Sequence, residues 1–418
     1  MFSNNPPLIS LLLLAGISVA SASPPDTERD YTGPRKNLAG VKVASSYERI
    51  TDGILYKRSE AETIALLKEI KTDLVFRGFW RWYPVPESPD DIPPELADQL
   101  KNMGITDVSG EVRKAGYSHE QLKEAIASLK KEMPNILFVG SIPAQYINAM
   151  ELNEKTGELL GREKTRQMVL KPEKWGIGWG GLLRLVFGAK LKQFPDITNV
   201  EFQKLMLSWA EKQIDDGADA IWIDLLYTQA EAFKNIASVN SPATKESYAA
   251  ASKIVDKIHE YGTLKGKHIY VGTWAFPAIN LPYSAPSLDF VTLTPTSSEV
   301  SGRKLNEKSW DRNISKIKKK FGDIPVLLFI DWSDNNTPLS KFSQKLSKKE
   351  QRAFLGYLDN FSKNKGMVFV YPVHGGNMGS SSKIRSFGMK DDYGRVYDSL
   401  APEFDTYETI KALANNKE

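Results

Sequence analysis

The chain has 418 residues, 41% of them hydrophobic and none of them cysteine, so it can bury a large core and cannot rely on disulfides. Its 55 basic and 51 acidic side chains give a formal net charge of only +4, and no basic stripe is interleaved with aromatic residues, which argues against a nucleic-acid partner. Lysine runs at 318–320 and 345–349 fall in or beside expected surface helices and indicate solvated faces.

The amino terminus has the pattern of an export signal. An apolar stretch over 8–20 is too short to span a bilayer comfortably, and small residues follow at 18–23. We therefore expect a signal peptide over 1–23, no stable membrane insertion after its removal, and a secreted, periplasmic or cell-surface protein. Because 1–7 contains no Lys or Arg, an uncleaved anchor is the alternative. Residues 24–39 are expected to be a polar leader, and 40–418 a single domain.

Apolar, strand-like runs alternate with amphipathic helical runs through that domain. This alternation predicts parallel βα units, and eight such units predict an α/β fold of the (β/α)8 TIM-barrel type. The expected strands are 41–44 or 54–56, followed by 74–79, 136–140, 220–224, 269–273, 290–293, 326–331 and 367–371. A doubly wound open sheet is the alternative, but no Gly-rich phosphate loop follows an early strand.

Helix starts support this phasing. Pairs typical of a capping box, and one Ser-Pro start, mark the helices: Ser59 with Glu62, Thr198 with Glu201, Ser347 with Glu350, Asp405 with Glu408, and Ser241 before Pro242. Connections before the strands are short, whereas long loops over 80–118, 141–199, 274–288 and 372–402 follow them. Long loops at the carboxyl ends of the strands predict a functional site on that face of the barrel.

Three carboxylates are candidate catalytic groups. Asp224 ends the expected strand 220–224 and shares a strand face with Trp222, whereas Asp331 ends the strand 326–331. Glu299 follows the strand 290–293 by a few residues. Acidic groups that converge on one barrel mouth are what glycosidic cleavage requires, since one acid protonates the leaving oxygen and a second acts as base or nucleophile. A structural carboxylate that caps a helix or forms an ion pair is the alternative for each.

Other polar and aromatic side chains stand at or near strand ends and are candidate substrate contacts. Arg77 lies within an apolar strand, where a charge needs a partner, and a carboxylate at the mouth would supply one. Aromatic faces at a mouth suit sugar rings, and core packing is the alternative for each. The candidate substrate-binding residues are Arg77, Trp80, Trp82, Tyr227, Trp274, Trp332, Tyr371 and His374. The four His residues have no metal-site spacing, so we predict neither a metal nor a cofactor.

Two short phrases carry a family resemblance. The segment from Gly217 to Asp224 resembles the Gly-Phe-Asp-Gly-x-x-x-Asp segment of secreted glycosidase barrels, and 196–199 resembles the phrase that precedes the adjoining helix. The chain is similar in these phrases to the group that includes endo-α-1,4-polygalactosaminidases. The resemblance implies a catalytic carboxylate at Asp224. The family's second carboxylate, a Glu on a later strand, has no counterpart here, because the fifth strand ends in Thr273-Trp274.

Two functions of different classes remain. The first is a glycoside hydrolase that cleaves an extracellular polysaccharide or glycan, with Asp224 and either Asp331 or Glu299 as its carboxylate pair. The second is a catalytically silent barrel that binds carbohydrate or a cell-envelope polymer. A Gly- and Trp-rich stretch over 175–181 is either a lid or an inert insertion. The sequence does not indicate an oligomeric state.

Overall fold

A computed structural model describes residues 38–48, 50, 58–80, 119–147, 151–156, 158–178, 194–332, 336–378 and 396–417. The predicted signal peptide and nearly all of the predicted leader lie outside these residues. No helix among the described residues is both long and apolar enough to cross a membrane.

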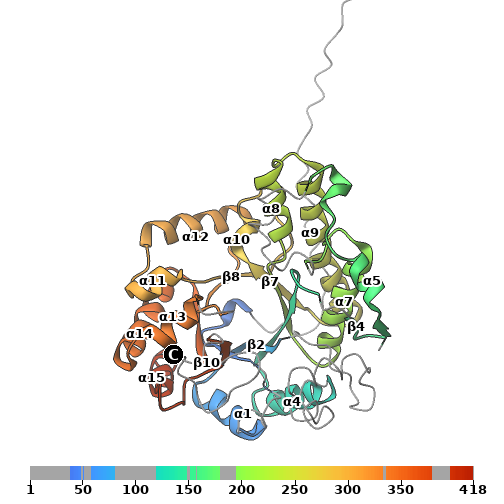
Figure 1. Ribbon diagram of the computed structural model, residues 1–418. Helices are drawn as coiled ribbons and strands as arrows, with labels where there is room; N and C mark the ends of the chain where they lie inside the picture. The colour runs from blue at the N-terminus through green and yellow to red at the C-terminus, as the bar shows by residue number, and fades with distance from the viewer. Residues whose placement is uncertain are drawn as a thin grey trace, which may run out of the picture. The chain divides into compact units, whose positions relative to one another are not determined.

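Eight parallel strands close into a barrel surrounded by helices (Figure 1). They pair in the order β1, β2, β3, β6, β7, β8, β9 and β10, and β10 closes the barrel on β1, with Val370 opposite Ala44. The bounds of these strands are β1 Ala44–Tyr47, β2 Leu74–Trp80, β3 Leu137–Pro143, β6 Ala220–Asp224, β7 Tyr270–Trp274, β8 Phe290–Leu293, β9 Val326–Leu328 and β10 Val368–Asn377. The predicted (β/α)8 fold is confirmed.

Three further strands among the described residues lie outside the barrel. β4 (Glu151–Asn153) and β5 (Glu158–Leu160) form an antiparallel hairpin in the long connection after β3. β11 (Val396–Asp398) pairs antiparallel with the far end of β10. These additions belong to the long connections that the sequence places after the strands.

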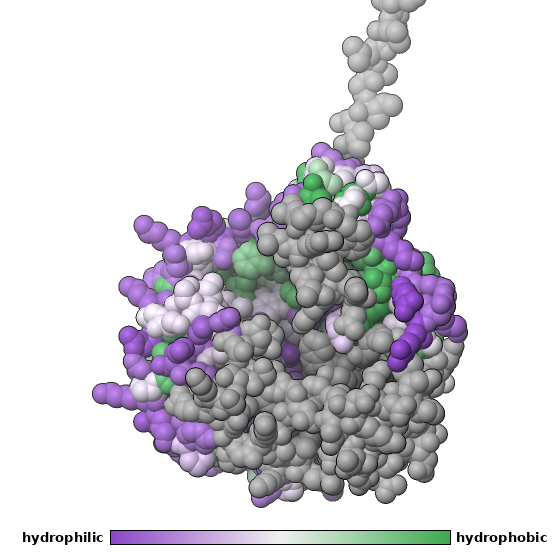
Figure 2. All heavy atoms as spheres, in the orientation of Figure 1, coloured by the Kyte–Doolittle hydropathy of each residue, from purple (hydrophilic) through white to green (hydrophobic). Residues whose placement is uncertain are grey.

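The outer layer and the connections contain the helices. Their bounds are η1 Leu38–Gly40, α1 Glu60–Glu69, α4 His119–Glu132, α5 Arg162–Gln167, η3 Pro172–Trp175, α7 Val200–Asp215, α8 Thr228–Ile236, α9 Pro242–Leu264, α10 Ala275–Ala278, α11 Ser297–Gly302, α12 Glu307–Phe321, α13 Pro338–Lys345, α14 Lys348–Asn364 and α15 Tyr407–Asn415. Hydrophilic residues dominate the rim formed by α11, α12 and α14 (Figure 2). In the two predicted lysine runs, Lys318 and Lys319 on α12, Lys345 at the end of α13, and Lys348 and Lys349 on α14 are exposed. Lys320 is half-buried, and its Nζ donates to the carbonyl of Leu281 at 2.7 Å.

Several predicted boundaries were wrong for identifiable reasons. β1 begins at Ala44, where the predicted run 41–44 ends, because the N–H groups of Lys42 and Val43 bond to the Asp73 carboxylate instead of a neighbouring strand. The alternative first strand, 54–56, lies outside the described residues. β9 ends at Leu328, three residues before Asp331, whose N–H bonds to the Thr294 hydroxyl.

The helix caps were predicted with mixed success. Full capping boxes form at Ser59 and Ser347, and Ser241 caps α9. Thr198 does not cap α7: the next residue, Asn199, accepts its first N–H groups, and the Thr198 hydroxyl bonds to Asp196 instead. Asp405 does not cap α15 either, because it lies in the left-handed region at φ +53° and Thr406 is the N-cap.

Three aspartates, each at the amino end of a barrel strand, accept a backbone N–H from the neighbouring strand or the residue that leads into it. The Oδ2 atom of Asp73, before β2, accepts the N–H of Val43 at 2.9 Å. Asp219, before β6, accepts the N–H of Phe138 on β3 at 2.9 Å. Asp289, before β8, accepts the N–H of Val271 on β7 at 2.7 Å. These bonds satisfy backbone donors at the end of the barrel opposite the predicted site.

Candidate active site

Three aromatic side chains pack together in the barrel interior near the carboxyl ends of the strands, and we call them the aromatic floor. Phe76, Trp222 and Phe329, from β2, β6 and the segment after β9, are buried and in mutual ring contact, with centroids 5.0–6.0 Å apart. The indole N–H of Trp222 donates to the Thr292 hydroxyl at 3.1 Å. The floor therefore separates the packed core from the polar residues above it.

Asp224 is the last residue of β6. Leu225, which follows it, is in the left-handed region at φ +51°, so the chain turns away directly after the carboxylate. The Oδ1 atom of Asp224 accepts the indole N–H of Trp274, at the end of β7, at 2.6 Å. The Oδ2 atom accepts the side-chain amide N–H of Gln145, after β3, also at 2.6 Å. Two donors, one from each side of β6, thus fix the orientation of this carboxyl.

The surroundings of Asp224 favour its protonated form. Burial raises the pKa of this carboxyl above its usual range, and the Arg77 charge and the two hydrogen bonds offset this only in part. A buried carboxyl with a raised pKa can hold a proton at a pH where an exposed one has lost it.

Arg77 reaches the interior through an irregularity in β2. Strict alternation would put it on the opposite face from Phe76, but the register with β3 shifts between Val75 and Phe79, and Arg77 has φ +56°. A left-handed conformation at a non-glycine residue costs about 1–3 kcal/mol. The strained backbone directs the Arg77 side chain into the barrel, and strain of this kind is common at functional sites.

The guanidinium of Arg77 is buried between acidic and aromatic groups. Its Nη1 lies 3.9 Å from Oδ1 of Asp331, and its Cζ lies 3.8 Å from the ring centroid of Trp332 and 5.2 Å from that of Trp222. Burial lowers the pKa of Arg77, whereas the negative charges of Glu48, Asp224 and Asp331 raise it. The three carboxylates and one arginine therefore form a single electrostatic cluster.

Glu48 is the member of this cluster that the sequence analysis missed. It follows β1 directly, its side chain is buried, and its Oε2 accepts the N–H of Gly376 at 2.8 Å. The available signal was the same as for Asp224, an acid at the end of a barrel strand. It was missed because β1, Ala44-Ser45-Ser46-Tyr47, has little apolar character and was placed three residues too early.

Glu299 lies apart from this cluster. It occupies the third position of α11, where Oε2 accepts the N–H of Thr296 in a capping box. Its Oε1 accepts the N–H of Asn306 at 2.8 Å and the indole N–H of Trp310 at 3.0 Å. The Glu299 carboxylate thus links the start of α11, through Oε2, to the start of α12, through Oε1.

Two predicted aromatic contacts are packed among helices. Tyr227 precedes α8 with its ring fully buried, and its hydroxyl lies 3.3 Å from that of Ser252 on α9. Tyr371 on β10 is likewise buried and donates to Asp359 on α14 at 2.8 Å. These contacts are those of core residues.

His374 lies on β10 opposite Tyr47 of β1, and it is buried. Its Nδ1 is 2.8 Å from Asp398 on β11, and its ring lies 5.0 Å from that of Tyr47. Arg58 donates to both Tyr47 and Asp398 at 2.8 Å. The four residues form a buried polar network that joins β1, β10 and β11.

The remaining candidates are only partly described. The side chain of Trp80 and the whole of Trp82 lie outside the described residues. Trp332 and Trp274 both contact the floor through Phe329, with ring centroids 5.7 and 5.0 Å from it. The structure therefore brings together Arg77, Asp224, Asp331, Trp274 and Trp332 from the set predicted by sequence.

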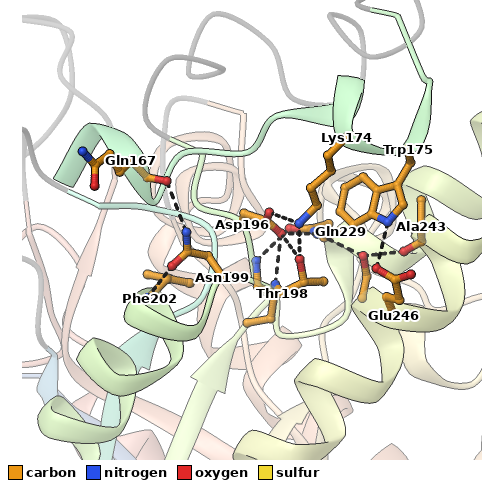
Figure 3. Close-up of polar contacts among 12 residues, drawn as sticks. Gln167, Lys174, Trp175, Asp196, Thr198, Asn199, Phe202, Gln229, Ala243 and Glu246 are labelled. Atoms are coloured by element: carbon orange, nitrogen blue, oxygen red, sulfur yellow. Dashed lines mark hydrogen bonds and ion pairs between the residues drawn. The ribbon is translucent and has the colours of Figure 1, made fainter. Parts of the chain in front are cut away.

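The described part of the Gly- and Trp-rich stretch, 175–178, contacts helices α8 and α9 through Trp175 (Figure 3). The indole N–H of Trp175 donates to Glu246 on α9 at 2.9 Å, and its ring packs against Phe233 on α8. Lys174 pairs with Asp196, which also accepts the Gln229 amide at 3.0 Å. Residues 179–181 lie outside the described residues.

Within the ranges that the structure describes, no group of three or more His, Cys, Asp or Glu side chains is arranged to hold a metal ion. No family model matches the chain, and no curated protein matches it. The fold is nevertheless shared with solved structures.

One similar structure is the γ-CGTase of Alkalophilic bacillus clarkii, with a TM-score of 0.51 at 12% identity over 91% of this chain. The match covers 57% of that enzyme, so this chain spans little more than half its length. Looser matches include a debranching enzyme of Nostoc punctiforme, with a TM-score of 0.46 at 11% identity over 85% of this chain and 69% of that one. Another is the glycoside hydrolase domain of PelA from Pseudomonas aeruginosa, with a TM-score of 0.36 at 11% identity over 60% and 83% of the two chains. The first likeness shows the class of fold, a (β/α)8 barrel.

Proposed function

We propose that the protein is a glycoside hydrolase that cleaves a polysaccharide or glycan with Asp224 and Asp331 as its carboxylate pair. The observation that carries this proposal is that both carboxyls act on one buried arginine, in surroundings that favour different protonation states. Asp224 is buried, with a raised pKa. Asp331 has a side chain 27% exposed and lies beside Arg77, whose positive charge favours a carboxylate.

In the reaction, Asp224 donates its proton to the glycosidic oxygen as the bond from that oxygen to the anomeric carbon breaks. Ionised Asp331 either accepts a proton from the water that attacks the anomeric carbon, or attacks that carbon itself. In the second case the glycosyl ester that forms is hydrolysed by a water that gives its proton to the Asp224 carboxylate. Trp274 and Trp332 supply aromatic surface beside the carboxyls for the apolar faces of sugar rings. Neither step requires a cofactor.

The export pattern over 1–23 supports an extracellular, periplasmic or cell-surface glycan as the substrate. The phrase ending in Asp224 resembles the corresponding segment of the endo-α-1,4-polygalactosaminidase group, which supports assigning a catalytic carboxylate to this position.

The test is a screen of the purified protein on a panel of polysaccharides, beside Asp224→Asn and Asp331→Asn. Each variant is expected to lose about 10²–10⁴-fold in kcat/KM on a natural glycan. On a dinitrophenyl glycoside, whose leaving group needs no protonation, Asp224→Asn is expected to regain activity and Asp331→Asn is not. Unchanged cleavage by Asp224→Asn would refute the mechanism.

Asp219→Asn is the matched control, because Asp219 immediately precedes the same strand at its opposite end and bonds to Lys130 and the Phe138 N–H. It is expected to lower stability and leave kcat unchanged at 25 °C. If the wild-type protein binds a glycan tightly and none of the proteins cleaves it, the alternative of a catalytically silent carbohydrate-binding barrel is correct.

A further inference from the structure

Two hydrogen-bond donors flank the Asp224 carboxyl, and one of them, Gln145, has no part in the proposed reaction. Gln145 follows β3 by two residues and is half-buried. Its Nε2 donates to Oδ2 of Asp224 at 2.6 Å, while the indole N–H of Trp274 donates to Oδ1 from the other side of β6. With a donor on each oxygen, the proton that Asp224 itself carries has few directions left in which to point.

We propose that Gln145 is a positioning residue, a fixed donor beside Oδ2 that directs the proton of Asp224 toward the barrel mouth and the glycosidic oxygen. This inference rests on the proposed function for its catalytic meaning. The contacts that support it are hydrogen bonds and strand register.

The orientation of the Gln145 amide is fixed by the neighbouring backbone. The N–H of Ala144 donates to the Asp224 carbonyl at 3.1 Å and also to Oε1 of Gln145 at 3.2 Å. A flipped amide would place its NH2 group 3.2 Å from this N–H, with one donor facing another. The amide oxygen is therefore held by Ala144, and Nε2 is the atom of Gln145 that faces Oδ2.

The register of the barrel strands places both donors. Pro143 lies opposite Asp224, so the chain that leaves β3 passes directly beside this carboxyl. On the other side of β6, Thr273 lies opposite Ile223, and Trp274 follows it. Both donors are thus attached to backbone that the barrel holds in place, as preorganised groups in an active site require.

The donors restrict where the acid proton can lie. The indole of Trp274 can only donate, and the fixed amide of Gln145 presents a donor, so a proton on Asp224 finds no acceptor along either contact. Arg77, the charged group among the described residues that acts on Asp224, has no acceptor atom either. Asp224 is the one residue of β6 that keeps some solvent exposure, so its proton is left to point to that side.

Gln145→Met keeps the length of the side chain and removes both of its polar ends. On a natural glycan, it is expected to lose about 10–100-fold in kcat with little change in KM, because the acid proton is no longer directed. On a dinitrophenyl glycoside, whose leaving group needs no proton, it should keep nearly wild-type activity. An equal loss on both substrates would show a purely structural role and overturn the inference.

A readout without turnover separates this inference from the proposed function. In protein labelled with 13C at the Asp carboxyls, the Asp224 resonance is assigned by its loss in Asp224→Asn and titrated in each variant. Because the Gln145 donor stabilises the ionised carboxyl, the midpoint should rise by about one pH unit in Gln145→Met. It should rise further in Gln145→Glu, which replaces the donor by a second carboxyl that shares the proton.

Gln203→Met is the matched control, since Gln203 is a half-buried glutamine on α7 that donates to the Ile197 carbonyl at 2.9 Å. It should leave the Asp224 midpoint and kcat in place. A midpoint that is unmoved or lowered in Gln145→Met, or no higher in Gln145→Glu than in Gln145→Met, overturns the inference, whether or not the protein proves to be a hydrolase. Midpoints raised in the expected order in a protein that cleaves no glycan support the inference and refute the proposed function.

Discussion

The indole N–H of Trp274, the last residue of β7, donates a 2.6 Å hydrogen bond to Oδ1 of Asp224, the last residue of β6. The bond is made across two neighbouring strands with Thr273 opposite Ile223, so their register sets the distance between the indole and the carboxyl. It favours the ionised carboxyl and therefore opposes the effect of burial.

Trp274→Phe is expected to raise the pKa of Asp224 further, because the variant keeps the ring and removes the donor. The alkaline limb of the kcat/KM profile should move to higher pH. Trp310→Phe is the control, since it removes an indole donor from Glu299 instead. A shift to lower pH in Trp274→Phe would contradict this account.

Arg77→Gln is expected to destabilise the protein by about 3–5 kcal/mol at neutral pH, because buried carboxylates lose their counter-ion. The loss should depend on pH. Without Arg77, the pKa of Asp224 in the folded state rises further above its unfolded value, so the added penalty is absent while the carboxyl is protonated in the folded wild type and grows as the pH rises above the folded wild-type pKa. Urea unfolding at pH 4 and pH 7 measures the difference, and equal losses at both would be contrary to expectation.

Glu299→Ala tests the structural assignment of a residue that the sequence made a catalytic candidate. Loss of the capping-box partner and of its bonds to Asn306 and Trp310 should lower the free energy of unfolding by about 0.5–2 kcal/mol. Glu350→Ala, in the capping box of α14, is the matched comparison. Both variants should keep the wild-type kcat at 25 °C, and a loss of several orders of magnitude in Glu299→Ala alone would restore it to the reaction.

His119 is expected to make stability depend on pH in the alkaline range. Burial lowers the pKa of His119, but the carboxylates of Glu154 and Asp216 outweigh it and raise the pKa to about 9. The pKa of His119 in the folded state exceeds its unfolded value of about 6.5. The protonated His119 therefore adds to the free energy of unfolding fully below pH 6.5, and this stabilisation is lost as the pH rises through 9.

His119→Gln should therefore remove part of the decline in unfolding free energy between pH 6.5 and 9. Lys212 is a second basic group 3.9 Å from Asp216, and Lys212→Gln separates its effect from that of His119. Parallel pH dependences in the wild type and His119→Gln would show that His119 is not the group responsible.

The fold was predictable because each βα unit carries its own local signal. The bounds predicted for β6 and β8 agree with the observed ones, since both are short apolar runs between clear turns. The strand most poorly predicted, β1, is short and contains two serines, so its position depends on pairing with β2 and β10. Long-range pairing of this kind leaves little trace in a local sequence pattern.

The candidate site was only partly predictable. Asp224 stands where an alternating strand ends, which sequence can show. The inward direction of Arg77 depends on a register shift and a left-handed backbone, which alternation does not predict. Glu299 shows the converse: the Thr296-x-x-Glu299 spacing is a capping box, and that signal could have removed it from the catalytic candidates.

The aspartates at the amino ends of β2, β6 and β8 have a practical consequence. They hold neighbouring strands together by accepting backbone N–H groups. Their effect therefore does not depend on the identity of the side chains at the carboxyl ends of the strands. Loops at the carboxyl ends can therefore be exchanged or lengthened while these anchors keep the barrel in register. For protein engineering, the scaffold offers the face at the carboxyl ends of the strands for redesign and a separate face to leave unchanged.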